Sequence, residues 1–289
     1  MKKVLGIFTI LVFLFASCDI IEGPYLEPNN ETKTDVEFPE LNKDSVIRKI
    51  LFEEFTGHYC TNCPEKGHRV LEGLIAQYGD LLVPVTIHAG GLAAPREEPY
   101  TYDFRTEMGD QLYTDFGVNS VPCAMVNRVK KGTSWISFYR DWQGQIDAVD
   151  KTKIVAGIQI INQYDEAKKV LLAHTKTTML SDYENPIMLC VVMIEDDIIA
   201  PQLDNNNTIL EYVHHHALRA GLNGTYGAYL NDKNDGIVQK DSAYTKSYKL
   251  EFNKLPQGDV NYKNCTIVTY IYDAVTKEIL QAECRKVVE

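Results

Sequence analysis

Apolar and polar positions in the first part of the chain follow a strand, a helix and a second strand in turn. Residues 46–55 are strand-like, and the apolar positions after them recur every four residues, which predicts a helix over about 60–78. The apolar run LLVPVTIHAG at 81–90 is typical of a buried strand. Together these segments predict a βαβ unit over residues 46–89, with parallel strands and a right-handed crossover.

A second helix, a strand and a third helix are expected before residue 150. In the second helix, which should end at Gly117, the apolar residues again fall four apart: Phe104, Met108, Leu112 and Phe116. The strand that follows is opened by Pro122, and the third helix carries Trp142 and Ile146. We therefore expect one α/β domain over residues 46–150.

The pattern changes from about residue 152 to a series of strands with polar turns between them. The strand-like segments are KIVAGIQIINQY, KKVLLAHTKTTML, IMLCVVMIEDDI, SAYTKSYKLEF and NCTIVTYIYD. Such spacing favours a sandwich of two sheets. The predicted fold is therefore an α/β domain followed by an all-β immunoglobulin-like sandwich domain over residues 151–289.

The N-terminus has the layout of a secretory signal. Two lysines precede an apolar run that is too short to span a bilayer, and small residues follow it before Cys18. The ending resembles a bacterial lipobox, in which cleavage of a signal peptide over residues 1–17 leaves Cys18 to carry acyl chains such as palmitate. An ordinary signal peptide is the alternative. Residues 18–45 are acidic and contain prolines, which predicts an extended, solvated tether.

Composition and charge exclude some classes of partner. The chain is 45% hydrophobic and 24% charged, which is typical of a globular protein. Its net charge is −11, and removing the two lysines of the signal makes it −13. Because this charge repels phosphate backbones, we expect no nucleic acid partner.

Candidate chemistry centres on the stretch FTGHYCTNCP, where Cys60 and Cys63 stand at the expected start of a helix. Backbone N–H groups and the helix dipole stabilise a thiolate there, so Cys60 is expected to attack and Cys63 to resolve the mixed disulfide. Glu54 shares a strand face with apolar residues. A buried carboxylate with a raised pKa could take the proton of Cys63, whereas an acid at the strand rim would contact water.

This arrangement resembles the thioredoxin fold over residues 46–150. The resemblance implies that Pro122 is cis and holds substrate backbone beside the cysteine pair, that Cys60 and Cys63 are the attacking and resolving thiols, and that Glu54 replaces the usual buried Asp. The sequence departs from thioredoxins at Tyr59, at the dipeptide Thr61-Asn62 and at Cys123.

Nearly the whole mature chain resembles a narrower family. The segments FTGHYCTNCP, YVHHHALRAGLNGTYG and ILQAECRKV are similar to those of the outer-membrane-protein-28-related lipoproteins of Bacteroidota. This resemblance implies an outer-membrane location with a lipid anchor at Cys18, on the periplasmic face or the cell surface.

Two functions are expected from these observations. The first is a thiol-disulfide oxidoreductase that acts on protein thiols or disulfides of the envelope and needs no cofactor beyond its own disulfide. The second is a binding or adhesion lipoprotein that keeps the thioredoxin-like half as a scaffold.

Other cysteines and histidines leave further interpretations open. Cys123, a possible third thiol, would lie near Cys60 and could form an alternative disulfide. A metal site built from Cys60, Cys63, Cys123 and His58 is possible but not favoured, because His58 could equally be a solvated loop residue.

Two more groups of residues need a structure to interpret. In a strand, His214 and His216 of the run His214-His215-His216 would share a face, which is a weak metal signal beside a structural role. Cys265 and Cys284 flank a predicted hairpin turn. They could form a disulfide if the register places them opposite each other.

Overall fold

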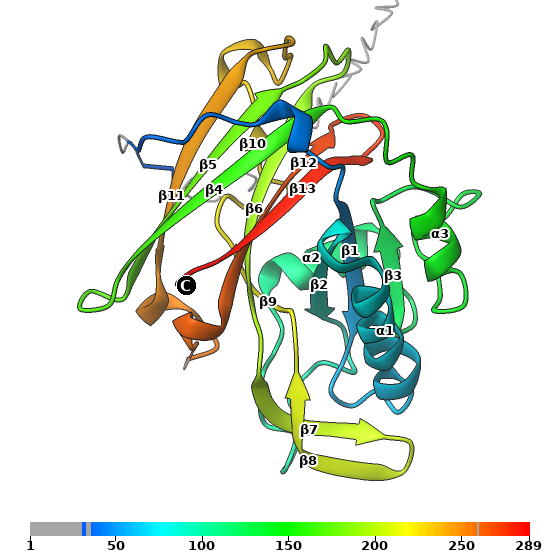
Figure 1. The fold of residues 1–289 in the computed structure, drawn as a ribbon. Helices are drawn as coiled ribbons and strands as arrows, with labels where there is room; N and C mark the ends of the chain where they lie inside the picture. Colours follow the sequence, from blue (N-terminus) through cyan, green and yellow to red (C-terminus); the bar gives the residue numbers. More distant parts are fainter. Residues whose placement is uncertain (1–30, 33–35, 259) are drawn as a thin grey trace, which may run out of the picture.

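The computed structural model describes residues 31–32, 36–258 and 260–289, which form a mixed α/β fold with more strand than helix (Figure 1). The expected signal peptide and Cys18 lie outside the described residues. In the part of the chain that is described, no helix has the length and apolar character needed to cross a membrane.

The predicted βαβ unit is present. Strand β1 (Ile50–Thr56) pairs in parallel with β2 (Leu82–His88). Between them a π-helical turn (Pro64–His68) leads into α1 (Arg69–Tyr78), so the helix begins a few residues later than expected. Strand β3 (Cys123–Val126) pairs antiparallel with β1 on its other edge. The cysteine pair therefore follows the strand at the centre of this unit.

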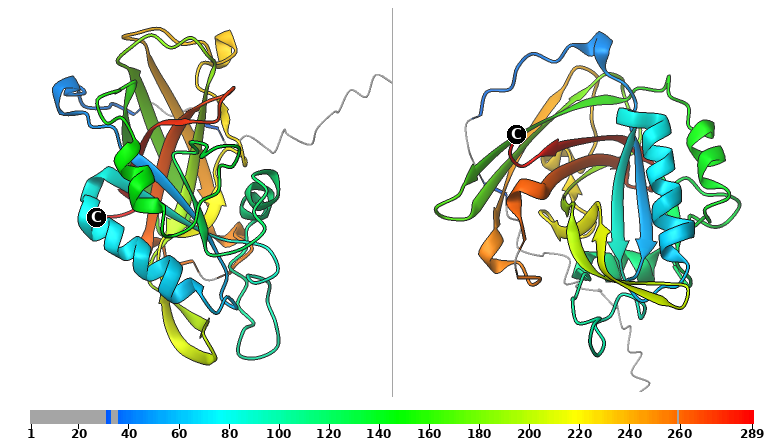
Figure 2. Two further views of the ribbon diagram at one scale, coloured as in Figure 1. Left: turned by 90° about the vertical axis from the view of Figure 1, so that its right-hand side faces the viewer. Right: turned by 60° about the horizontal axis from the view of Figure 1, so that its bottom comes forward.

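Helices cover both faces of these three strands, and side chains alternate between the two faces along β1. On one face, α1 and α3 (Trp142–Ala148) form a core with Phe52 (Figure 2). On the other face, α2 (Glu107–Asp115) packs with Phe55. Successive residues of β1 therefore enter different cores.

The sheet does not stop at the end of the first half. Strand β9 pairs with β2 on one side and with β6 on the other, which joins the two halves into one eight-stranded sheet. From the far edge to β2 its order is β13 (Ile279–Lys286), β12 (Cys265–Asp273), β6 (Ile187–Glu195) and β9 (Ala217–Gly221), with β10 (Ala228–Tyr229) beside β6. The prediction of a separate immunoglobulin-like sandwich is therefore not confirmed.

A second layer covers the outer part of this sheet. It is a three-stranded sheet of β4 (Ala156–Asp165), β5 (Val170–Met179) and β11 (Ala243–Glu251). Its apolar residues share a core with those of β6 and β12. The second half thus has the two packed sheets that the strand pattern predicted, but one of them belongs to both halves.

The predicted tether is partly docked on this second layer. Glu31 forms a β-bridge with Tyr248 of β11, and the side chain of Gln159 donates a hydrogen bond of 2.9 Å to the carbonyl of Pro39. A Cβ atom on Gly157 would lie 2.6 Å from Leu41. Residues 36–45 are therefore not a free tether, because these contacts hold them against the sheet.

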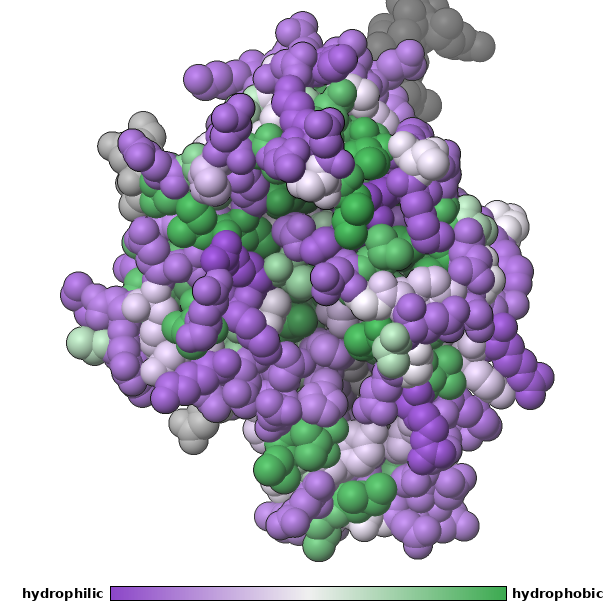
Figure 3. Space-filling model, in the orientation of Figure 1, coloured by the Kyte–Doolittle hydropathy of each residue, from purple (hydrophilic) through white to green (hydrophobic). Residues whose placement is uncertain are grey.

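A two-stranded hairpin extends from the second half beneath the first. It consists of β7 (Ile198–Asp204) and β8 (Asn207–His214), and β9 follows it directly. Both views of the ribbon place it beyond the lower end of the sheet (Figures 1 and 2). It also exposes the apolar side chains of Ile199, Leu210 and Val213 at that end of the molecule (Figure 3).

Candidate redox site

Cys60 and Cys63 form a disulfide with their Cα atoms 5.4 Å apart. Cys60 lies in the turn after β1, where its N–H donates to the carbonyl of Gly57 at 3.0 Å, and Cys63 caps the π-helical turn. Cys60 therefore lies in the turn that leads into the helix, and Cys63, not Cys60, holds the cap position. In the oxidised chain both residues are buried, with Cys60 3% exposed.

Pro122 lies beside the cysteine pair, as the resemblance implied. The Val121–Pro122 peptide bond is cis, and the sulfur of Cys60 is 3.7 Å from the carbonyl oxygen of Val121. A Cβ atom on Gly67, one helical turn beyond Cys63, would lie 2.9 Å from the Cβ of Pro122. The proline loop and the helix that carries Cys63 are thus in close contact.

Glu54 is fully buried against the same helix, so the alternative of a rim acid in water is wrong. A Cβ atom on Gly67 would lie 2.3 Å from its Oε1. Burial raises the pKa of Glu54 to about 8, while the Thr86 hydroxyl lowers it and the Glu72 carboxylate raises it by smaller amounts. The carboxyl can therefore be protonated at neutral pH and exchange a proton near it.

Cys123 is a free thiol, so the alternative disulfide with Cys60 is not formed in this structure. It pairs with Phe55 across β1 and β3, and its side chain belongs to the core beneath α2. Burial, with a smaller effect of the Glu54 charge, raises the pKa of Cys123 to about 12. The thiol is therefore protonated at neutral pH, which is unfavourable for attack or for metal binding.

His58 is not a solvated loop residue. It is 1% exposed and stacks on Tyr100, with 5.6 Å between the ring centroids. Among the described residues, no three His, Cys, Asp or Glu side chains are placed to hold a metal ion. Cys60 and Cys63 are joined in a disulfide in this structure, so they are not arranged as metal ligands with His58 and Cys123.

The hairpin holds the cysteine loop from the other half of the chain. Leu203 and Asn205 donate backbone hydrogen bonds of 2.8 and 2.9 Å to the carbonyls of His58 and Thr61. The buried side chain of Gln202 donates to the carbonyl of Cys60 at 3.2 Å. We did not predict this contact. The sequence feature that could have indicated it is Gln202 itself, a polar residue that shares the buried face of β7 with Ile198 and Ala200.

The histidine run contributes to the site in a way that differs from the prediction. Strand β8 ends at His214, and His216 has a φ of 56°, so these two residues do not share a strand face. His214 is buried beside His88, with 5.4 Å between the ring centroids, and beside His68 at 6.2 Å. The run therefore brings one imidazole to the helix that carries Cys63.

Cys265 and Cys284 are not opposite each other. In the hairpin of β12 and β13, Cys284 pairs with Val268, and both cysteines are free thiols. The side chain of Asp273 accepts hydrogen bonds from the backbone of Val275 and Thr276 in the turn, which the sequence predicted around Ala274-Val275 if the two cysteines were to lie opposite each other. The register is shifted accordingly, and the possible disulfide is not formed.

Comparisons with known proteins identify relatives of this chain. The family model described as outer membrane protein Omp28 matches residues 109–289. HBP35 of Porphyromonas gingivalis has a similar fold, with a TM-score of 0.64 and 18% identity over 84% of this chain and 76% of that one.

A second solved structure is a domain of the outer membrane lipoprotein Omp28 from Porphyromonas gingivalis. It is 22% identical over 46% of this chain and 88% of that one, with a TM-score of 0.31. No curated protein sequence matches the chain.

Proposed function

The chain belongs to the Omp28 family of outer membrane proteins, and from this premise we propose that it is a thiol-disulfide oxidoreductase of the cell envelope. Membership confirms the predicted family and the outer membrane location. The proposal includes a lipid anchor at Cys18 and a thioredoxin-like first half. The observation that carries it is a disulfide at a helix start with a buried, protonatable acid and a cis-proline loop beside it.

Each residue has a defined role in the proposed reaction. When the reduced pair acts on a partner's disulfide, the Cys60 thiolate attacks one of its two sulfurs, the partner's S–S bond breaks, and its other sulfur leaves as a thiolate. Cys60 is then joined to the partner in a mixed disulfide. Cys63 then attacks the sulfur of Cys60, the bond from Cys60 to the partner breaks, and the partner leaves as a thiolate. Two electrons pass from the pair to the partner, and the proton of Cys63 passes to the Glu54 carboxylate. Pro122 positions the partner's backbone. Oxidation of a partner dithiol runs through the same steps in reverse.

A redox titration of the mature chain tests this function. The protein is equilibrated with glutathione buffers of increasing reducing power, the thiols are trapped, and peptide masses report the state of each cysteine. We expect Cys60 and Cys63 to change state together while Cys123, Cys190 and Cys265 stay reduced and buried. A pair that never exchanges with glutathione would remove the proposal.

A binding or adhesion function is the second candidate, and two observations favour it. Cys60 is buried beneath the hairpin in the oxidised chain, and the hairpin exposes apolar side chains, which on a surface often mark an interaction site. In this case the disulfide is a structural link. Replacing Cys60 and Cys63 with serine discriminates the two functions. If the chain is a binding protein, the variant still binds its envelope partners.

A further inference from the structure

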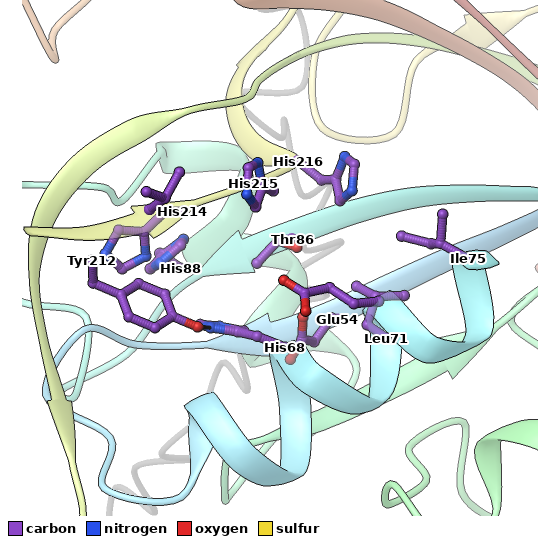
Figure 4. A pocket seen from close by; sticks show the side chains of 12 residues that line it. Glu54, His68, Leu71, Ile75, Thr86, His88, Tyr212, His214, His215 and His216 are labelled. Atoms are coloured by element: carbon purple, nitrogen blue, oxygen red, sulfur yellow. Dashed lines mark hydrogen bonds between the residues drawn. The ribbon is translucent and has the colours of Figure 1, made fainter.

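We call the π-helical turn Pro64–His68 and α1 together the redox helix. A small cavity lies between this helix and strand β8 of the second half. Its volume is about 20 Å³, which is enough for one water molecule. We call it the histidine cavity. Its inner wall is made of side chains from β1, β2, the π-helical turn and β8 (Figure 4), namely Glu54, His68, Thr86, His88, Tyr212 and His214. The two halves of the chain therefore enclose it together.

Several buried polar atoms around the histidine cavity have no hydrogen-bond partner of standard geometry among the described residues. They are both oxygens of Glu54, both ring nitrogens of His88 and Nδ1 of His214. All three residues are at most 3% exposed. Because unpaired buried polar atoms are costly, a site with this lining favours a bound water that can satisfy several of them at once.

The outer end of the histidine cavity reaches solvent. Glu72, an exposed residue of α1, lines it on one side, and His215, with a side chain 37% exposed, lines it on the other. Glu54 and Glu72 both line this cavity. A proton that leaves Glu54 thus has titratable groups at the mouth to receive it.

The lining favours proton transfer over metal binding. Both ring nitrogens of His68 are occupied, Nδ1 by the Tyr212 hydroxyl at 2.8 Å and Nε2 by the Thr56 hydroxyl at 3.0 Å. The same hydrogen bonds hold the cavity wall in place, because they join the redox helix to β1 and to β8. Burial lowers the pKa of His88 and of His214 well below the ordinary value, so these imidazoles stay neutral and add no charge beside Glu54.

We propose that a water bound in the histidine cavity carries protons between Glu54 and solvent, and that Glu72 and His215 form its mouth. The inference rests on the proposed function, because Glu54 must lose the proton it takes from Cys63 before the next turnover. It also gives the β7–β8 hairpin a part in the reaction: β8 supplies the outer wall of the proton route.

Exchange of the Glu54 proton with deuterium tests the route without requiring any activity. The oxidised mature chain is moved from H₂O to D₂O at pH 6.5, and the carbonyl stretch of the protonated carboxyl, assigned by its loss in Glu54→Gln, is followed by infrared spectroscopy. Glu72→Leu and His215→Leu place apolar side chains at the mouth. We expect each to slow the exchange on the order of tenfold, and the double variant to slow it further.

Glu65→Leu is the matched control, because Glu65 is a partly exposed glutamate on the same helical segment that does not line the cavity. Its exchange rate should equal that of the unaltered chain. Equal rates in all variants, or slowing in the control as well, would overturn the route.

Glutathione exchange of the cysteine pair, measured in parallel, separates the proton route from the proposed redox function. An active pair with unslowed mouth variants contradicts the route alone, and an inert pair with slowed variants contradicts the redox function alone.

Discussion

Glu53 and Glu54 are neighbours on β1, both buried, yet they lie in opposite environments. Glu53 points into the core beneath α2 and binds Arg128 through two hydrogen bonds of 2.7 and 2.8 Å. Burial alone would lower the pKa of Arg128, but the Glu53 carboxylate and nearby Tyr270 raise it well above the ordinary value. Glu54 points to the redox helix, where its two oxygens find no hydrogen bond of standard geometry within the part of the chain that the structure describes.

The difference shows how one strand supplies both a structural acid and a reactive one. A buried charge with a buried partner joins the elements around it. Here Arg128, in the turn after β3, binds Glu53 of β1 and donates a hydrogen bond of 3.2 Å to the hydroxyl of Tyr270 in β12. A buried acid without a partner is easily neutralised, so its proton is available for chemistry. The predictions below separate these two roles.

The largest expected effect is a loss of stability when the Glu53–Arg128 pair is broken. Arg128→Met should lower the free energy of unfolding by about 3–5 kcal/mol, because it leaves the Glu53 charge buried and unpaired. Urea denaturation at pH 7 measures this. Lys168→Met, which removes an exposed ion pair with Asp165, is the control and should change stability far less, because solvent screens exposed charges. If both variants lose the same small amount, the buried pair is not structural.

Gly67 tests how tightly the helix packs on Glu54. Gly67→Ala should destabilise the chain by about 1–3 kcal/mol, since its Cβ would meet Glu54 and Pro122. Gly73 is the matched control on the same helix, because a Cβ there meets nothing within 4 Å. Gly73→Ala should be neutral or stabilise by up to about 1 kcal/mol. Thermal unfolding of the two variants compares them, and a stabilising Gly67→Ala would contradict the packing.

The pH dependence of stability isolates Glu54. Its pKa of about 8 in the folded chain lies above the value in the unfolded chain, so the unfolded state releases the proton first and stability falls as pH rises. Between pH 6.5 and 8 the Glu54 contribution should fall by roughly 1.5 kcal/mol, measured as the change in the difference in unfolding free energy between the unaltered chain and Glu54→Gln. An unchanged slope in this variant would mean that Glu54 is ionised throughout.

Below pH 6.5 the histidines change the stability of the chain with pH in the direction opposite to that of Glu54. Burial lowers the pKa of His68 to about 4 and that of His88 and His214 well below the ordinary value. The unfolded state then binds the extra protons, so stability falls as pH decreases from 6.5. Maximum stability is therefore expected near pH 6.5 to 7, which denaturation at several pH values can check.

Local sequence patterns predicted the parts of the site that one stretch of chain builds. The inward position of Glu54 and the placing of Cys60 before a helix depend on neighbours in β1 and the helix, whereas the proline beside the pair was implied by the family resemblance. These features follow from strand alternation and helix spacing, which a few residues determine.

Pairing between distant segments could not be predicted in this way. β9 joins β2 through a single parallel pair, Thr86 with Ala217, and no periodicity in either strand signals it. The position of Gln202 over Cys60 and the neighbourhood of His68 and His214 both depend on this join. The sequence also does not determine the register that relates Cys265 to Cys284. This register depends on the turn between them, which is set by side-chain hydrogen bonds of Asp273.

The central claim is that Glu54 exchanges a proton with a redox-active cysteine pair. The most direct test is the rate at which the reduced pair reacts with oxidised glutathione from pH 6 to 9, in the unaltered chain and in Glu54→Gln. If Glu54 exchanges the proton, the rate should change with an inflection near pH 8, and Glu54→Gln should react more slowly and without this inflection. Identical profiles in the two proteins, or a pair that does not react at all, would contradict the claim.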